Sequence, residues 1–315
     1  MANRNEILSR IGEYKNAGQD IIRRQYLSEL NDYTKNDTIV YAASFPCNIP
    51  VASNNLSIGL NDIQGFMTCI NKLKGEKLDL IIHSPGGSLE ATEQLVQYLR
   101  AKYKYIRAIV PQNAMSAATM LACACDEIVM GKQSAIGPID PQMTLTRSNG
   151  IAYSLPAHSI LADFAKAKSE IAADSNAAKV WVPKLLEIPN GFLDLCVKTI
   201  QLSKSKVAEW LNMYMFKDSD DKPGETIANW LGDFNEHKTH GRPINYLLAQ
   251  EKGLKIKLLE DDQEFQDRVL NVFHATLVTF DVTTCVKLIE NHLGKGSYIV
   301  MHPQIAQHLP MVGKQ

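Results

Sequence analysis

The middle of the chain alternates between two apolar patterns. Four short apolar runs predict strands, at 38–42, 78–83, 105–110 and 127–130. The run Leu78–His83 is nearly continuous, as in parallel strands that are buried on both faces. Amphipathic or small-residue stretches between these runs predict helices, at 61–73, 89–102 and 113–125. Strands that alternate with helices of this length form βαβ units, so the sequence predicts an α/β fold with a parallel sheet.

The flanking segments differ from this central pattern. Residues 1–36 are dense in charge and carry apolar positions at helical spacing, which predicts an exposed helical N-terminal arm that packs on a neighbouring subunit. Residues 37–216 form the predicted core, which is mostly helical from residue 156 onward. The polar stretch 217–225 predicts an exposed loop. Residues 226–315 are expected to form a C-terminal α/β extension that completes the core and contributes oligomer contacts.

Charge and composition narrow the classes of function. The 315 residues contain 33 Lys+Arg and 34 Asp+Glu, and the formal net charge of −1 argues against a general binder of nucleic acid or of anionic membranes. The uncharged stretch 108–125 has a truly apolar part of only 12 residues, whereas a membrane span needs about 20. The N-terminus is polar and has no apolar h-region, so no secretory signal is expected. We interpret the six cysteines as reduced, mostly buried thiols, which favours a cytoplasmic protein.

A glycine-rich turn follows the predicted strand 78–83. Gly86 and Gly87, in the sequence Ser84-Pro-Gly-Gly, allow a sharp turn and leave backbone amides open to a ligand. The helix that follows directs its free N–H groups at the same space. The turn therefore suits an oxyanion or a phosphate, with a plain strand-to-helix turn as the alternative interpretation.

Ser116 lies at the start of the small-residue helix predicted over 113–125. Its hydroxyl would lie in the field of a buried helix start, and the Ala117 N–H would be free to donate to an oxyanion. Small neighbours such as Ala114 and Ala118 would let a substrate approach closely. A helix-capping or packing serine is the alternative interpretation.

A serine nucleophile needs a base, and helical phase favours Lys168. The segment 158–173 has one apolar face, formed by Ile160, Leu161, Phe164 and Ile171. Lys168 falls in the middle of this face, whereas Lys166 falls roughly opposite. A lysine in this position either extends to water or is desolvated, which favours a neutral amine that can act as a base. The pattern leaves both interpretations open.

No metal or cofactor is expected. His237-x-x-His240 has the spacing of a metal-binding pair, but it lies in a polar stretch with no matching carboxylate or cysteine. No Cys-x-x-Cys motif occurs, and no Gly-x-Gly-x-x-Gly follows a predicted strand. The sequence therefore argues against a zinc site and against a nicotinamide site.

The order of these features resembles a known superfamily. After Ser84-Pro-Gly-Gly87 and Ser116 come Cys125-Asp-Glu-Ile-Val129 and Ser134-Ala-Ile-Gly137. This order resembles the ClpP/crotonase superfamily and, more closely, the signal peptide peptidase A-like serine peptidases. His240-Gly-Arg-Pro-Ile244 and Glu251-Lys-Gly-Leu254 extend the likeness, which covers about residues 38–290. The whole pattern resembles the bacterial family named serine dehydrogenase proteinase, although nothing in the sequence supports a dehydrogenase.

The resemblance implies a ClpP/crotonase-like superhelix of ββα units and assigns roles to the residues above. Ser116 would be the nucleophile, with the Gly87 and Ala117 amides as the oxyanion hole and Gly86 shaping it. The place expected for the ClpP-type histidine reads Gly-Pro-Ile-Asp-Pro at 137–141, with no histidine. Signal peptide peptidase A-like enzymes use a lysine instead. That role falls to Lys168, with Lys166, Lys184 or a residue of a neighbouring subunit as rivals.

We therefore expect a serine peptidase with a Ser116/Lys168 dyad that hydrolyses peptide bonds through an acyl-enzyme. Its partners would be a peptide or protein substrate and further copies of itself in a homo-oligomer, with no nucleic acid and no membrane span. One alternative is a catalytically inactive ClpP-like scaffold or sensor that binds a peptide. Another is a crotonase-type acyl-CoA enzyme, which would use the same two amides and need no serine nucleophile.

Overall fold

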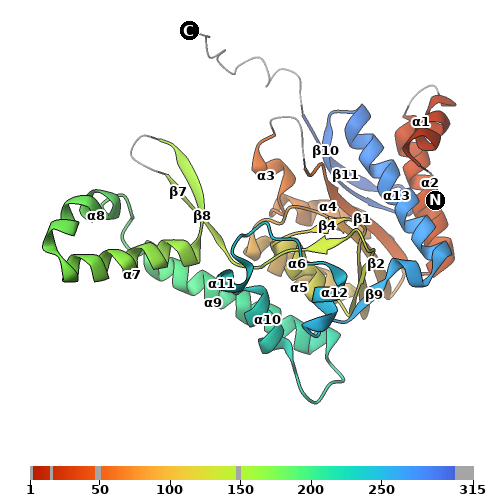
Figure 1. Ribbon diagram of the computed structural model, residues 1–315. Helices are drawn as coiled ribbons and strands as arrows, with labels where there is room; N and C mark the ends of the chain where they lie inside the picture. Colours follow the sequence, from red (N-terminus) through yellow and green to blue (C-terminus); the bar gives the residue numbers. More distant parts are fainter. Residues whose placement is uncertain (1–2, 15–16, 47–50, 147–149, 302–315) are drawn as a thin grey trace, which may run out of the picture.

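The computed structural model describes residues 3–14, 17–46, 51–146 and 150–301. In these residues the centre is a seven-stranded sheet in the order β11-β10-β1-β2-β3-β5-β9 (Figure 1). The parallel strands are β1 Asp37–Ala43, β2 Lys77–His83, β3 Tyr105–Val110, β5 Glu127–Met130 and β9 Ile256–Leu258. The antiparallel strands β10 Cys285–Asn291 and β11 Gly296–Val300 extend the sheet beyond β1. The predicted α/β fold with a parallel sheet is confirmed.

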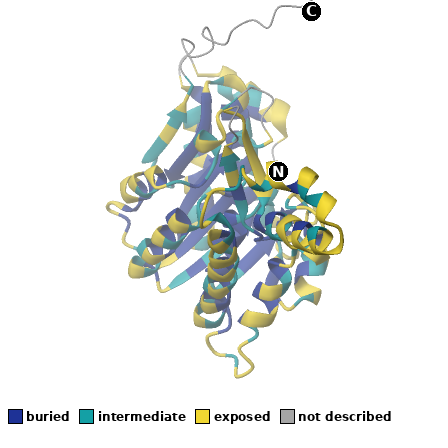
Figure 2. Cartoon of the chain, turned by 90° about the vertical axis from the view of Figure 1, so that its left-hand side faces the viewer, coloured by how far each residue is buried: buried dark blue, intermediate teal, exposed yellow. Residues whose placement is uncertain are grey.

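Alternating side chains of the central strands divide the apolar interior into two layers. In β1, Ile39 and Tyr41 belong to one layer, whereas Val40 and Ala42 belong to the other. The first layer is covered by α4 Asn61–Ile70, α5 Leu89–Lys102, α6 Ala117–Cys123, α9 Phe192–Trp210, α10 Gly224–Leu231 and α12 Tyr246–Glu251. The second is covered by α1 Arg4–Gly12, α2 Gly18–Thr34 and α13 Gln263–Val282. Figure 2 shows the strands in dark blue between helices whose outer faces are exposed.

A short second set of β-pairs lies beyond the carboxyl ends of the parallel strands. β4 Asn113–Ala114 pairs in parallel with β6 Ala135–Ile136. Isolated bridges continue this pairing, and they join Ile58 to Gly87, Ser84 to Ala114, and Ile136 to Ile244. Open α/β sheets bind ligands at the carboxyl ends of their strands. These bridges therefore align the segments from which a site is expected.

A hairpin and two helices project from the body of the molecule (Figure 1). The hairpin consists of β7 Gln142–Thr146 and β8 Ala152–Pro156. It leads into α7 Ala157–Ala173, which packs against α9, and then into α8 Ala178–Leu185. The hairpin was not predicted from the sequence. The remaining short elements are α3 Ser53–Leu56, α11 Phe234–His237, the 3₁₀ turns Ser175–Ala177 and Leu259–Asp261, and the π-helical turn Leu211–Met215.

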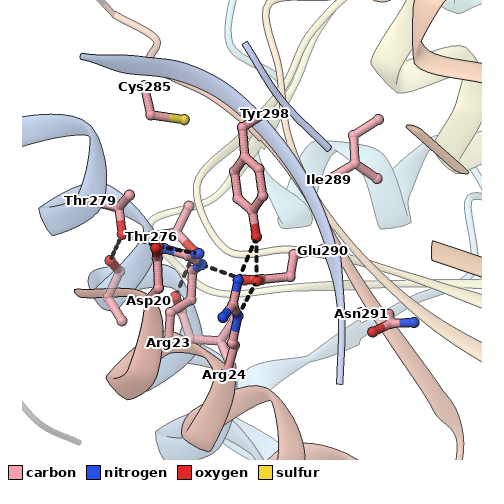
Figure 3. Close-up of polar contacts among 12 residues, drawn as sticks. Asp20, Arg23, Arg24, Thr276, Thr279, Cys285, Ile289, Glu290, Asn291 and Tyr298 are labelled. Carbon is pink, nitrogen blue, oxygen red and sulfur yellow. Dashed lines mark hydrogen bonds and ion pairs between the residues drawn. The ribbon is translucent and has the colours of Figure 1, made fainter. Parts of the chain in front are cut away.

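The N-terminal helices pack on their own chain, which corrects the expectation of an exposed arm. α2 lies against α13, and its Arg23 has no solvent exposure. Figure 3 shows Arg23 and Arg24 both directed at Glu290 of β10. The Nε atoms of the two arginines lie 2.6 Å from separate oxygens of this carboxylate. The dense charge of residues 1–36 predicted exposure, because the local sequence does not show that Arg23 pairs with Glu290, 267 residues further along the chain.

Two predicted boundaries also differ. The helix expected over 113–125 begins only at Ala117, because residues 113–114 form β4 and Ser116 has a non-helical backbone. The loop expected over 217–225 ends at Pro223, since α10 begins at Gly224.

The described helices and cysteines bear on the expectations of no membrane span and of reduced, buried thiols. Among the described residues, no helix is both long and apolar enough to cross a bilayer. The cysteines that the structure describes are free and buried, at positions 69, 123, 125, 196 and 285. Cys47 lies outside the described residues.

Candidate active site

Ser116 occupies a strained turn between β4 and α6. Its backbone has φ 53° and ψ −120°, and positive φ is uncommon for a residue with a Cβ and costs about 1–3 kcal/mol. Its side chain makes no capping hydrogen bond to α6, so the helix-capping interpretation is wrong. Strained strand-to-helix turns of this type expose a serine Oγ in nucleophile elbows. The residue is partly exposed, so its hydroxyl is accessible rather than sealed in the core.

The glycine turn lies directly against this serine. Ser84 bridges Ala114 in parallel, which brings Gly86 opposite Ser116. A Cβ added at Gly86, where φ is +103°, would lie 2.7 Å from Ser116 Cβ and 2.6 Å from the Met115 carbonyl oxygen. Only glycine fits this close approach. The Gly86 N–H donates to Ser84 Oγ at 3.2 Å, so Gly86 shapes the site without offering a donor.

Two free backbone N–H groups accompany the hydroxyl. Ile58 bridges Gly87 in parallel through the carbonyl before this glycine and the N–H after it. The N–H of Gly87 therefore points away from Ile58. Ala117 is the first residue of α6, where an N–H has no acceptor within the helix. Neither N–H donates to another described residue, and both residues line one cavity together with the serine.

This cavity has a volume of about 410 Å³ and lies between the sheet end and the projecting hairpin. Its apolar wall consists of Leu89, Met120, Ile139, Met143 and Leu195. Its polar lining includes Ser57, Ser88, Glu90, Gln142, Thr199, Ser203 and His240. The space can hold an apolar side chain beside a carbonyl group placed over the two N–H donors.

His240 enters the cavity wall as part of a pair with Asp140. His240 Nδ1 lies 2.9 Å from Asp140 Oδ1. Asp140 is buried, and its other carboxylate oxygen accepts from Gln142 Nε2 at 3.1 Å. The pair follows from the antiparallel bridge between Ile136 and Ile244. Asp140 lies four residues after Ile136 and His240 four residues before Ile244, so this bridge brings the two segments close to each other.

The lysine expected as the base lies outside this cavity. Lys168 is exposed and does not line the cavity. α7 begins at Ala157, whose N–H donates to the cavity residue Pro141. Lys168 is eleven residues further along this helix, which corresponds to a rise of about 16 Å. The rivals Lys166 and Lys184 are also exposed and outside the cavity lining.

Burial limits the chemistry of other reactive groups. It raises the pKa of the Cys125 thiol to about 12, so this thiol is not a nucleophile near neutral pH. It also lowers the pKa of His83 to about 4, and His83 Nε2 lies 2.6 Å from the Phe45 carbonyl oxygen. His237 is buried, with Nε2 2.8 Å from the Trp230 carbonyl oxygen. No group of three or more His, Cys, Asp or Glu in the described part of the chain could hold a metal ion.

Sequence reasoning found part of this constellation. Ser116, the Gly86–Gly87 turn and Ala117 were all identified, and they lie around one cavity. The pairing of Asp140 with His240 was missed. Asp140 stands where the resemblance expected a histidine, and His240 opens one of the motifs that carried the resemblance. The missing information was the bridge that brings two segments about 100 residues apart into register.

Comparison with known proteins supports this assignment of the region. The family described as ClpP-like SDH-type serine proteinase matches residues 57–258, which include every residue of the cavity lining. An uncharacterized protein of Methanocaldococcus jannaschii is 31% identical over 202 residues, covering 63% of this chain and 60% of the relative. A second one is 36% identical over 184 residues, covering 57% and 51%. The match thus spans little more than half the length of these relatives.

Among solved structures, the 1510-N membrane-bound stomatin-specific protease is similar at 16% identity and a TM-score of 0.39, covering 67% of this chain and 79% of that chain. The same protease in complex with a substrate peptide gives a TM-score of 0.28 at 16% identity, covering 69% and 93%. The family match covers more than half of the sequence and contains the whole candidate site. The chain therefore belongs to the ClpP-like SDH-type serine proteinase family.

Proposed function

We propose that this chain hydrolyses peptide bonds through an acyl-enzyme formed on Ser116. The observation that carries the proposal is a strained, uncapped serine beside the free N–H groups of Gly87 and Ala117 in one cavity. Such donors contribute about 3–4 kcal/mol each when they hold the oxyanion of the transition state. Membership of a serine proteinase family supports a peptidase over other hydrolases.

The cavity also indicates a class of substrate. Leu89, Met143 and Leu195 supply an apolar wall beside the serine. Burying an apolar side chain there is favourable by about 25 cal/mol for each Å² removed from water. We therefore expect cleavage of peptides or proteins next to an apolar residue.

The base expected from the sequence is Lys168. Because Lys168 lies on the projecting part of α7, outside the cavity of its own chain, a Ser116/Lys168 dyad would have to form between subunits. Mixing Ser116→Ala and Lys168→Ala subunits tests this arrangement. If the dyad forms between subunits, each inactive variant supplies the group that the other lacks, and the mixture recovers peptidase activity.

Two alternatives make different use of the same cavity. An inactive peptide-binding scaffold needs the cavity but has no use for a strained serine. A crotonase-type acyl-CoA enzyme needs the two N–H donors but no hydroxyl. The strain at Ser116 favours the peptidase, because backbone strain of this kind persists where a function requires it.

The experiment is labelling by a fluorophosphonate probe, followed by turnover of a peptide library. We expect labelling of the wild-type protein at Ser116 and its loss in Ser116→Ala. Ser205→Ala, on an exposed part of α9, is the control that should label normally. A wild-type protein that neither labels nor cleaves would support the scaffold. Acyl-CoA turnover that survives in Ser116→Ala would support the crotonase-type enzyme.

We further propose that the protein acts as a cytoplasmic homo-oligomer. Its described cysteines are all free and buried, which fits a reducing compartment. Self-association would cover apolar residues that the projecting helices leave exposed, among them Val180 and Leu186.

A further inference from the structure

A buried ion pair contacts the segments around the glycine turn. Lys287 of β10 and Asp62 of α4 are 3% and 4% exposed, and neither lines the Ser116 cavity. Lys287 Nζ lies 2.8 Å from one carboxylate oxygen of Asp62 and 3.0 Å from the other. The attraction between two buried charges offsets the loss of their hydration only where further hydrogen bonds satisfy them. The remaining contacts of this pair therefore show what it holds in place.

The ion pair holds the backbone on both sides of Ile58. Lys287 Nζ donates to the carbonyl oxygen of Ser57 at 2.8 Å. The N–H of Gly59 donates to Asp62 Oδ2 at 3.0 Å. The N–H and the carbonyl of Ile58 itself form the bridge to the glycine turn. The ion pair therefore fixes the segment against which this turn is aligned.

A chain of hydrogen bonds connects the same carboxylate to the turn from a second side. Tyr41 Oη of β1 donates to Asp62 Oδ2 at 2.8 Å, and the Ser84 hydroxyl donates to the Tyr41 oxygen. Ser84 Oγ in turn accepts the N–H of Gly86 at 3.2 Å. Tyr41 and Ser84 have no solvent exposure. Burial, followed by the charge of Asp62, raises the pKa of Tyr41 well above its ordinary value, so its hydroxyl remains a donor.

These contacts determine how the peptide group between Gly86 and Gly87 is oriented. The Ile58 N–H donates to the Gly86 carbonyl at 2.7 Å. In a planar trans peptide group the N–H points opposite to the carbonyl, so the Gly87 N–H is turned away from Ile58. Glycine has no Cβ that would restrict this peptide group, and its rotation would replace the oxyanion donor by a carbonyl oxygen. The donor therefore depends on contacts from outside the turn.

We infer that the ion pair of Lys287 and Asp62, together with Tyr41, positions the glycine turn so that the Gly87 N–H is held ready for the oxyanion. This inference rests on the proposed acyl-enzyme function, and it names positioning residues that act through the turn without touching the substrate. Donors stabilise an oxyanion most when their orientation is fixed in advance. Tyr41 and Lys287 lie outside residues 57–258, which the family matches. Strands β1 and β10 thus support the site without contributing a side chain to the cavity.

The test compares two tyrosines whose hydroxyls make the same kind of contact. Tyr41→Phe removes the donor to Asp62 and keeps the ring. Tyr103→Phe is the matched control, because Tyr103 is 1% exposed and its hydroxyl donates to the buried Asp37 at 3.1 Å. Asp37 begins β1, so this second contact lies at the amino ends of the parallel strands, opposite the cavity.

Three further variants and three readouts complete the experiment. The variants are Ser84→Ala, Lys287→Met and the double variant Tyr41→Phe/Ser84→Ala, and the thermal midpoint of each is recorded. The readouts are the rate of fluorophosphonate labelling, kcat and KM for a peptide substrate, and inhibition by a peptide aldehyde and by the matching peptide alcohol, both with a terminal leucine side chain. The aldehyde forms a tetrahedral oxyanion adduct with Ser116, whereas the alcohol does not. The ratio of the two inhibition constants therefore separates oxyanion binding from peptide binding.

Removing an oxyanion-hole donor lowers kcat by about 10²–10³-fold, and a donor that is present but poorly held should cost less. We expect Tyr41→Phe to lower kcat and the labelling rate by about tenfold with KM unchanged, and to weaken the aldehyde but not the alcohol by the same factor. Lys287→Met should lose at least as much, because the ion pair supports both routes to the turn. The double variant should lose no more than Ser84→Ala alone, since both residues act through one chain of contacts. Tyr103→Phe should match the wild type in every readout.

The outcomes separate this inference from the proposed function. Equal losses in Tyr41→Phe and Tyr103→Phe would indicate a general effect on stability and would overturn the inference, as would a folded Tyr41→Phe with wild-type rates. Equal weakening of the aldehyde and the alcohol would assign the contacts to peptide binding and would also overturn it. In each of these cases the wild type labels at Ser116 and the peptidase stands, whereas a wild type that neither labels nor cleaves means that the proposed function itself fails. If Tyr41→Phe does not fold, Ser84→Ala gives the same comparison, because it leaves the ion pair intact.

Discussion

At the scale of single residues, the backbone of Ser116 is maintained by its neighbours. The Ala118 N–H donates to the Met115 carbonyl at 2.9 Å, and the Met120 N–H donates to the Ser116 carbonyl at 3.1 Å. Gly86 leaves room for the serine Cβ on the other side. These contacts hold both ends of a turn that an L-residue does not favour by itself. The surrounding fold therefore stabilises a strained conformation that leaves the hydroxyl exposed.

This strain predicts that glycine at position 116 stabilises the protein while inactivating it. Glycine adopts positive φ without the clash of a Cβ, so we expect Ser116→Gly to be about 1 kcal/mol more stable than the wild type. Ser116→Ala keeps the Cβ and the strain, and its stability should stay close to that of the wild type. Urea unfolding of the three proteins measures the differences. A Ser116→Gly protein less stable than Ser116→Ala would contradict the assignment of strain.

The residue scale also marks where sequence reasoning stops. The serine and the double glycine could be predicted, because each residue type follows from a local demand, a hydroxyl at a turn and a backbone that approaches closely. Lys168 was selected by helical phase, which identifies a face of a helix but not what that face packs against. The pair of Asp140 and His240 depends on one antiparallel bridge, between Ile136 and Ile244. No local pattern in the sequence encodes that register.

At the scale of elements, the attachment of α2 to β10 depends on a buried carboxylate. Arg23 and Glu290 have no solvent exposure, and Glu290 also pairs with Arg24. Removing one partner of a buried ion pair leaves a charge without compensation and costs about 3–5 kcal/mol. Because Arg23 keeps Asp20 after Glu290→Gln, we expect a loss at the lower end of this range, about 3 kcal/mol, in urea unfolding. Arg23→Met should cost less, because Glu290 keeps Arg24 and Tyr298; equal losses would contradict this hierarchy.

A second prediction at this scale concerns acid and the end of β2. Burial lowers the pKa of His83 from 6.5 to about 4, so the fold favours the neutral ring. Below pH 6.5 the His83 ring binds a proton in the unfolded chain but not in the folded chain. The free energy of unfolding therefore falls as the pH decreases toward 4. A shift of this size corresponds to about 3 kcal/mol.

The measurement is the free energy of unfolding between pH 7 and pH 4, compared with His83→Gln. Glutamine can replace hydrogen bonds of the ring, such as the one to Phe45, but has no charged form. The wild type should lose about 3 kcal/mol more than this variant over the range. Parallel curves for the two proteins would exclude His83 as the source of acid sensitivity.

The elements themselves were predicted with unequal success, for physical reasons. The parallel strands were found because burial on both faces leaves long apolar runs such as Leu78–His83. The hairpin of β7 and β8 was missed although Gln142–Thr146 alternates polar and apolar residues, because its strands are short and mostly exposed. The N-terminal helices were found, but their burial was not. Arg23 is buried because two acids compensate its charge, Asp20 on its own helix and Glu290 on a distant strand.

At the scale of the whole molecule, the projection formed by α7 and α8 buries few of its own apolar residues. It stands away from the body in Figure 1 and keeps only a small apolar cluster, which includes Ile160 and Cys196. Val180 is 62% exposed and Leu186 is 79% exposed. Apolar residues gathered on an extended surface mark sites of association. With a net charge of −1, copies of this chain do not repel one another strongly.

We therefore predict that the projection holds two or more copies together. Changing Val180 and Leu186 to lysine places charges on the surface that association would bury, and the assembly should dissociate toward monomers. Light scattering coupled to size exclusion measures the mass. Leu293→Lys is the matched control, because Leu293 is also exposed, at 55%, but lies in the turn between β10 and β11. A double variant with the same mass as an oligomeric wild type would exclude this surface as the site of association. A monomeric wild type would contradict the prediction and would also remove the geometric basis for a Lys168 shared between subunits.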